Sequence, residues 1–161
     1  MSEDLEVVDK KEHILRLASP SEIHDKKLLH KSVHLLIVDK EGKICCCCRD
    51  FSFNPGWTAA GAHVLPGQDY DTAADDAVHK KLGLFCNLTE IGRIRVRGNN
   101  ENEVSQTYVG HVDKDSGLKP NDPMWKGGKF LNVEEIKQSI AQKKTTLHLA
   151  QSLELYLSQK Q

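Results

Sequence analysis

The chain has 161 residues, which is enough for one domain with a sizeable core and too few for two ordinary domains. It carries 22 Lys and Arg against 23 Asp and Glu, so no bulk charge points to a nucleic-acid polymer or a membrane surface. No apolar run approaches the ~20 residues that cross a bilayer, and the polar start MSEDLEVVDKKEH lacks the core of a signal peptide. We therefore expect one domain over residues 1–161, in the cytoplasm, without membrane or nucleic-acid partners.

The first part of the chain predicts short strands around one brief helix. LEVVD and HILRLA read as strands, and the serines of SPSEIHDKKLL are typical helix caps. VHLLIVDKEGKICCCC predicts a hairpin of two apolar strands that turns at Asp39–Gly42. FSFNPGWTAAG contains one proline and two glycines and predicts a loop.

Four of the five cysteines are consecutive, Cys45–Cys48. Consecutive side chains on a strand point to opposite faces, so the four thiols cannot converge on one metal ion. Free cysteine packs as a small hydrophobe, and a strand buried on both faces would explain the run. We favour this interpretation over a metal or redox role.

The middle of the chain predicts one helix and a second hairpin. The helix covers Asp71–Leu82, where apolar residues recur along one side. The hairpin is IGRIRVRGNNENEVSQTYVGHV, with its turn at Gly98–Asn100. LKPNDPMWKGGKFLNV then predicts a loop that leads into a strand at Lys129–Leu131.

Two helices are expected at the end of the chain. Asn132 and Glu135 resemble a capping pair for a helix that reaches about Gln142. Thr146 would cap the last helix, whose expected apolar register is Leu147, Ala150, Leu153 and Leu157. Strands first, one helix in the middle and helices last favour an α+β fold over a repeated βαβ order.

The stretch GAHVLPGQDYDTAADDAVHKKLGL, residues 61–84, resembles the Nudix box, whose pattern is G-x5-E-x7-R-E-U-x-E-E-x-G-U with U bulky and apolar. The resemblance implies a Nudix-type α/β/α sandwich with a mixed sheet. It also implies a divalent cation that neutralises the charge of a diphosphate substrate. The glycine, proline and apolar frame of the box is present.

The acidic residues of the box are replaced. Gln68 stands for its first glutamate, Ala77 for the next, and Lys80 and Lys81 for the final pair. As a hypothesis, Lys80 and Lys81 bind phosphate through a tethered ammonium in place of a metal ion. The alternative is drift after loss of function, with Lys80 in water and the stem of Lys81 covering the helix.

A longer stretch, roughly residues 5–140, resembles isopentenyl-diphosphate isomerase and the Nudix hydrolases closest to it; it includes EVVDKKEHI, LLHKSVHLLIVDKEGKI, PGWT and ENEV. The isomerase holds one metal ion among three histidines and two glutamates. Imidazoles and carboxylates suit Mg²⁺, Mn²⁺ or Zn²⁺. The alternative is that these are surface polar residues. The matching positions are His24, His30, His63, Glu101 and Glu103, with Glu103 also the candidate catalytic carboxylate.

Isomerase activity itself is disfavoured, because the position of the catalytic cysteine falls on Gly61 or Ala62. Arg49 matches an arginine that contacts diphosphate in the isomerase, although a solvent-facing arginine at a strand end is an equal alternative. Two functional hypotheses remain open: an atypical metal-dependent hydrolase of a small diphosphate-containing molecule, or a catalytically inactive Nudix-fold module that binds such a ligand. The sequence leaves enzyme activity and homodimer formation undecided.

Overall fold

A mixed sheet built around β3 (His30–Val38) lies at the centre of the protein. The computed structural model describes residues 4–49, 56–98, 101–113 and 125–160, without the side chains of residues 48–49 and 125–128. β3 pairs in parallel with β8 (Asn102–His111) and antiparallel with β6 (Ala60–His63), which makes the sheet mixed. The other strands are β4 (Ile44–Arg49), β5 (Gly56–Thr58), β7 (Leu88–Arg97) and β9 (Trp125–Leu131).

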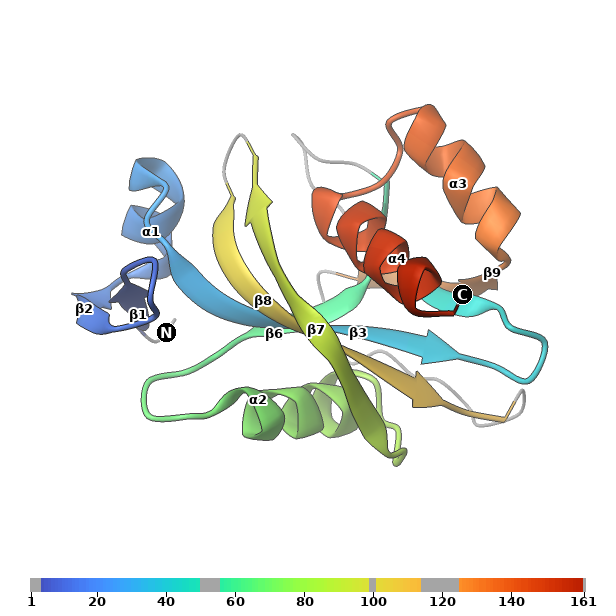
Figure 1. Ribbon diagram of the computed structural model, residues 1–161, viewed down its shortest axis with the longest axis horizontal. Coiled ribbons are helices and arrows are strands. Elements are labelled where there is room, and N and C mark those ends of the chain that lie inside the picture. Colours follow the sequence, from blue (N-terminus) through green and yellow to red (C-terminus); the bar gives the residue numbers. More distant parts are fainter. Residues whose placement is uncertain (1–3, 50–55, 99–100, 114–124, 161) are drawn as a thin grey trace.

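Helices cover both faces of this sheet (Figure 1). On one face lies α2 (Tyr70–Asp76), which continues as the π-helical segment η1 (Ala77–Lys81); on the other lie α3 (Val133–Ala141) and α4 (Leu147–Gln159). Alternate residues of β3 pack into the two cores, Val33 and Leu35 on the α2 side and Leu36 on the α4 side. The predicted α+β sandwich is confirmed. Among the described residues, no helix combines the length and apolarity that a membrane span needs.

The N-terminal elements form a separate unit at the end where β3 begins (Figure 1). β1 (Leu5–Val8) and β2 (Ile14–Ala18) form a two-stranded sheet, and α1 (Pro20–Lys26) follows with Ser19 as its N-cap. Ile23 of α1 is buried against this small sheet, and the amide of Val8 donates to the carbonyl of Leu29. Because α1 ends just before β3 begins, its last turn lies near the first residues of that strand.

Cys45, Cys46 and Cys47 are buried on both faces of β4, as predicted for the cysteine run, and the side chain of Cys48 lies outside the described residues. Cys45 and Cys47 lie in the core on the α2 side, and Cys46 lies in the core on the α4 side. All three side chains are fully buried. Burial raises the pKa of the Cys46 thiol to about 12, so it stays protonated near neutral pH.

Two predictions for the region between β3 and α2 need correction. β3 and β4 do meet at the expected turn, but their only registered pair is Val38 with Ile44. Beyond it the strands separate, since β3 takes β6 and β8 as neighbours while β4 takes β5 and β9. The segment that predicted a loop contains β5 and β6, whose small residues Gly56 and Gly61 allow close backbone approach. The remainder of that segment, residues 51–55, lies outside the described residues.

The helices differ from expectation in detail. The helix expected over Asp71–Leu82 begins at Tyr70, and its second half is π-helical. The capping box of α3 and the Thr146 cap of α4 are both confirmed. The expected buried register of α4 is only partly right: Leu153 is buried and Leu157 packs against the core, but Leu147 is 45% exposed, and the helix also buries Leu149, Ser152 and Tyr156.

Candidate functional site

A row of polar side chains lies on the α4 face of β3, at the end where this strand begins. His30, Ser32 and His34 alternate along the strand and share that face. The register of the neighbouring strands completes the row, because Glu103 of β8 lies beside His30 and His63 of β6 lies beside Ser32. Three strands therefore bring imidazoles and a carboxylate together below the surface.

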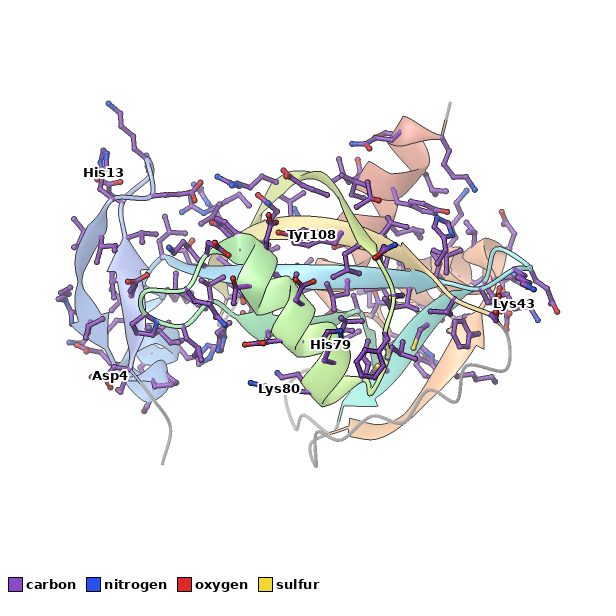
Figure 2. All side chains as sticks on the ribbon, turned by 90° about the horizontal axis from the view of Figure 1, so that it is seen from below. Asp4, His13, Lys43, His79, Lys80 and Tyr108 are labelled. Atoms are coloured by element: carbon purple, nitrogen blue, oxygen red, sulfur yellow. The ribbon has the colours of Figure 1, made fainter. Side chains whose placement is uncertain are left out.

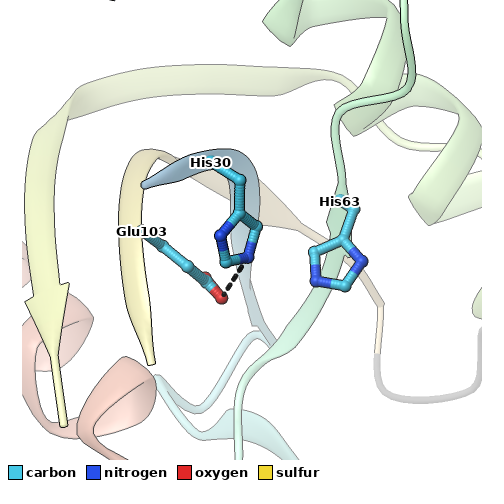
Figure 3. Close-up of side chains that lie close together, drawn as sticks. All are labelled: His30, His63 and Glu103. Atoms are coloured by element: carbon cyan, nitrogen blue, oxygen red, sulfur yellow. Dashed lines mark ion pairs between the residues drawn. The ribbon is translucent and has the colours of Figure 1, made fainter. Parts of the chain in front are cut away.

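His30 is held in an orientation that exposes one ring nitrogen to Glu103. Its Nδ1 lies 3.0 Å from the carbonyl oxygen of Leu28, so Nδ1 carries a proton and donates it. In the neutral ring, Nε2 then has a lone pair, and it lies 3.7 Å from Oε2 of Glu103 (Figure 3). His30 is 1% and Glu103 4% exposed, and Nε2 has no hydrogen-bond partner among the described residues. With this ring neutral, two buried acceptors face each other, whereas a proton on Nε2 would make the contact an ion pair.

Two further histidines border this pair. The ring of His63 lies 5.1 Å from that of His30, and His24 of α1 lies 6.0 Å from His30 and 6.1 Å from His63. Burial lowers the pKa of His63 to about 4, so its ring is neutral and able to act as a ligand. Single ligand atoms of His30, His63 and Glu103 all lie within 4.8 Å of one another. The structure therefore brings together four of the five residues expected to bind metal.

The fifth, Glu101, faces a residue that sequence reasoning missed. Its Oε2 lies 3.6 Å from Nε2 of His148, in the first turn of α4. The same Nε2 lies 3.2 and 3.3 Å from the two carboxylate oxygens of Glu103. No local signal marks His148, because the packing of α4 against the sheet brings it here.

His34 is the second residue that sequence reasoning missed. Its Nε2 lies 3.8 Å from Oε1 of Glu103, and its ring lies 4.6 Å from that of His148. The hydroxyl of Ser32 donates to the same Oε1 at 2.7 Å and also contacts the hydroxyl of Ser105. His34 had a usable signal: four residues after His30 on a strand, it must share the face of His30.

The charges of this cluster depend on the Glu103 carboxylate. Burial alone would raise its pKa, but the hydrogen bond and charge of His148, with the other histidines, hold that pKa well below the usual value. Burial would likewise lower the pKa of His148, yet hydrogen bonds to Glu101 and Glu103 raise it to about 10. Burial lowers the pKa of His34 to about 3. Without a bound cation, His148 is the positive partner of Glu103.

This pairing predicts a pH dependence of stability. A histidine whose pKa rises from 6.5 to about 10 on folding stabilises the protein fully below pH 6.5 and loses that contribution as the pH approaches 10. In metal-free buffer, we expect the free energy of unfolding to fall across this range with a slope of up to about 1.4 kcal/mol per pH unit. Urea unfolding of wild type and His148→Gln, at several pH values with a chelator present, measures the effect.

His148→Gln should lack this part of the alkaline loss, because glutamine does not titrate. Other groups that titrate at high pH are present in both proteins, so the difference between the two curves isolates His148. Parallel curves for the two proteins would contradict the assigned pairing.

The box residues lie at one border of the cluster. The ammonium of Lys81 donates to the carbonyl oxygen of Gly61 at 3.2 Å, and its charge helps to lower the pKa of His63. Lys80, in contrast, points away from the sheet (Figure 2) with its side chain 77% exposed, and its ammonium lies 3.8 Å from Oδ2 of Asp76. Gln68 also donates to Asp76, at 3.0 Å. The side chain of Arg49 lies outside the described residues.

No protein-family model and no curated protein matches the sequence. Solved structures do match it. DR0079 from Deinococcus radiodurans has a TM-score of 0.75 at 16% identity, over 92% of this chain and 96% of that chain. A Nudix hydrolase from Nitrosomonas europaea has a TM-score of 0.65 at 18% identity, over 82% and 90%. The Nudix domain of Shewanella oneidensis NrtR, complexed with ADP ribose, has a TM-score of 0.67 at 10% identity, over 89% and 100%. The protein has the Nudix fold.

Proposed function

We propose that the protein is a Nudix-type hydrolase that cleaves a diphosphate linkage in a small molecule. Its divalent cation would be held by histidines and glutamates from α1, β3, β6, β8 and the residue just before β8, in place of the box glutamates. The ligands are those that the isomerase resemblance implies: His24, His30, His63, Glu101 and Glu103.

The observation that carries this proposal is the geometry of His30 and Glu103. A buried lone pair that faces a buried carboxylate at 3.7 Å is repulsive unless a cation or a proton lies between the two groups. The Leu28 carbonyl accepts from Nδ1 of His30 and so fixes the tautomer and orientation of the ring. Metal-binding histidines are commonly oriented by a backbone carbonyl in this way. A mixed set of imidazoles and carboxylates suits Zn²⁺ or Mn²⁺ better than it suits Mg²⁺, which prefers oxygen ligands.

The residues around this position have separate roles in the proposal. A bound divalent cation would supply Lewis acidity and offset the charge of the diphosphate. Glu103 is the candidate catalytic carboxylate, because it stays ionised at the centre of the cluster. Lys81 is close enough to His63 to affect its pKa and could exchange its bond to the Gly61 carbonyl for one to a phosphate oxygen. Lys80 lies on the exposed side of the helix, so we assign it at most a long-range attraction of phosphate.

Turnover of a substrate panel tests the enzyme hypothesis. We expect Mn²⁺- or Zn²⁺-dependent release of phosphate-containing products from at least one member of a panel of ADP-ribose, nucleoside diphosphate derivatives and isopentenyl diphosphate. His30→Gln should lower the rate at least about 100-fold, since it removes a ligand. His79→Gln, at an exposed position on η1, is the matched control and should leave the rate unchanged. Loss of activity in both variants alike, or equal activity with a chelator, would contradict the assignment.

The second candidate is a binding module without turnover. It is favoured by the loss of the box glutamates and by the Lys81 ammonium at the Gly61 carbonyl, where a fixed positive charge already lies within the box. In that case diphosphate ligands should raise the melting temperature without metal and without product. Lys80→Glu together with Lys81→Glu should then weaken diphosphate binding, and an unchanged affinity would remove the role of both lysines.

Isomerase activity stays disfavoured. The position of the catalytic cysteine falls on Gly61 or Ala62, and the thiols of Cys45, Cys46 and Cys47 are buried in the two cores. A cytoplasmic location and the choice between monomer and homodimer stay predictions.

A further inference from the structure

We propose that Glu103 carries a second cation position on its other side, formed with His34 and His148, so that the site holds a pair of metal ions bridged by this carboxylate. The inference rests on the proposed function only through Glu103, which both positions share. His34 and His148 match no ligand of the isomerase-like set, and nothing in the Nudix box corresponds to them.

The two oxygens of Glu103 face two different groups of imidazoles. Oε2 lies 3.7 Å from Nε2 of His30, whereas Oε1 lies 3.8 Å from Nε2 of His34 and 3.2 Å from Nε2 of His148. Ligands bound 2.0–2.2 Å from a tetrahedral Zn²⁺ lie roughly 3.3–3.6 Å apart. The spacing on the Oε1 side is therefore already close to that of a coordination shell, and single ligand atoms of His34, Glu103 and His148 all lie within 4.8 Å of one another.

The surroundings of His34 supply an independent observation. The residue is 5% exposed, and its Nδ1 has no hydrogen-bond partner among the residues that the structure describes. Its Nε2 lies beyond hydrogen-bond distance of the carboxylate that it faces. A buried imidazole nitrogen that faces a carboxylate without a hydrogen bond is costly, and a cation between Nε2 of His34 and Oε1 of Glu103 would satisfy that nitrogen.

The sequence of α4 is consistent with a polar role for its first turns. The α4 face of β3 changes from polar at His34 to apolar at Leu36. α4 shows the same change, since the ring of His148 contacts that of His34, and Leu153 packs in the same core as Leu36. Thr146 fixes the start of the helix, since its hydroxyl contacts that of Thr58 and accepts from the amide of Leu149. The position of His148 is thus set by the fold and does not depend on a flexible chain end.

A pair of cations would suit the diphosphate ligand of the proposed function. Two divalent ions carry four positive charges, and the carboxylates of Glu101 and Glu103 offset two of them. The surplus matches the charge of a diphosphate bridged across both ions. Two-metal phosphoryl-transfer sites place their ions ~3.5–4 Å apart, a distance that one carboxylate can bridge. The partly exposed side chains of His24, His63 and Glu101 mark the side from which such a ligand would enter.

Metal content tests the proposal with the whole chain. After equilibrium dialysis against Zn²⁺ or Mn²⁺, we expect two equivalents per chain in wild type, one in His148→Gln and in His34→Gln, and one in His30→Gln. His79→Gln, the exposed control, should keep two. Circular dichroism confirms that each variant is folded. The wild type offers a second measurement, because two Mn²⁺ ions bridged by one carboxylate give a spin-coupled electron paramagnetic resonance spectrum.

The outcomes separate this proposal from the proposed function. The second position is overturned, and the first left intact, if wild type binds one equivalent of metal with an uncoupled Mn²⁺ spectrum. In that case His34→Gln and His148→Gln would keep this equivalent and His30→Gln would lose it. If wild type binds two equivalents of metal and only the His30 variant loses metal-dependent turnover, the second cation position is supported as a binding site. No bound metal in wild type overturns both.

Discussion

Replacing Glu103 with glutamine is expected to lower the affinity of the protein for Mn²⁺ or Zn²⁺ by at least about 100-fold, since residues that only support a metal ligand already contribute 10- to 100-fold. Glu103 lies between both groups of histidines, and its carboxylate is within 4 Å of both His30 and His34. Glutamine keeps the shape and can accept from the Ser32 hydroxyl, but it cannot offset the charge of an ion. Isothermal titration of the two proteins with Mn²⁺ measures the loss.

Glu134→Gln is the matched control for this experiment. Glu134 lies on α3 with its side chain 79% exposed and pairs with Lys137, so its loss should leave metal affinity unchanged. The metal-induced rise in melting temperature should vanish in Glu103→Gln and persist in Glu134→Gln. Equal affinity of Glu103→Gln and wild type would show that any bound metal lies elsewhere.

Gly56→Ala is expected to destabilise the fold by about 3 kcal/mol. Gly56 has a φ of +124°, and a Cβ there would overlap the carbonyl oxygen of Lys144 and lie 2.7 Å from its carbon. Lys144 lies in the connection between α3 and α4, and its carbonyl accepts from the amide of Trp57. Because backbone lies on both sides of the overlap, relief requires movement of the segment that places Thr146, the N-cap of α4. Urea unfolding at a fixed pH measures the change.

Gly42→Ala separates the overlap from the cost of the backbone angle. Gly42 also has a positive φ, +80°, but a Cβ there would meet no atom within 4 Å. We expect this variant to lose only about 1 kcal/mol. Since His148 lies two residues after Thr146, Gly56→Ala should also weaken metal binding, whereas Gly42→Ala should not. Equal destabilisation of the two variants would mean that the β5 contact with Lys144 is not close in solution.

Much of the fold follows from features of the sequence that act locally. The caps at Ser19, Asn132 and Thr146 each begin the helix that they predict, because a side-chain oxygen next to a free amide acts within one turn. The cysteine run has no polar face, and its described side chains, Cys45–Cys47, are indeed buried on both sides of the strand. β7 and β8 form the predicted hairpin, with their residues paired from Leu88–Gly110 to Arg97–Asn102.

The features that the sequence did not reveal depend on contacts between distant segments. β5 and β6 are too short to show periodicity, and they exist because β4 and β3 provide edges for pairing. The register of α4 was only partly right: Leu153 is buried as expected, but the helix also buries Leu149, Ser152 and Tyr156, and it largely buries His148 in a polar patch beside Glu103. His34 and His148 belong to that patch, and they become neighbours only through tertiary packing.

The most direct test of a histidine–carboxylate metal centre is anomalous X-ray scattering from crystals equilibrated with Zn²⁺. We predict a strong peak within bonding distance of Nε2 of His30, the ring of His63 and Oε2 of Glu103, with a weaker or equal peak between His34 and His148. Well-ordered crystals that show zinc at surface sites only, with His148 still bonded to Glu103 and the space beside His30 filled by water, would contradict the account.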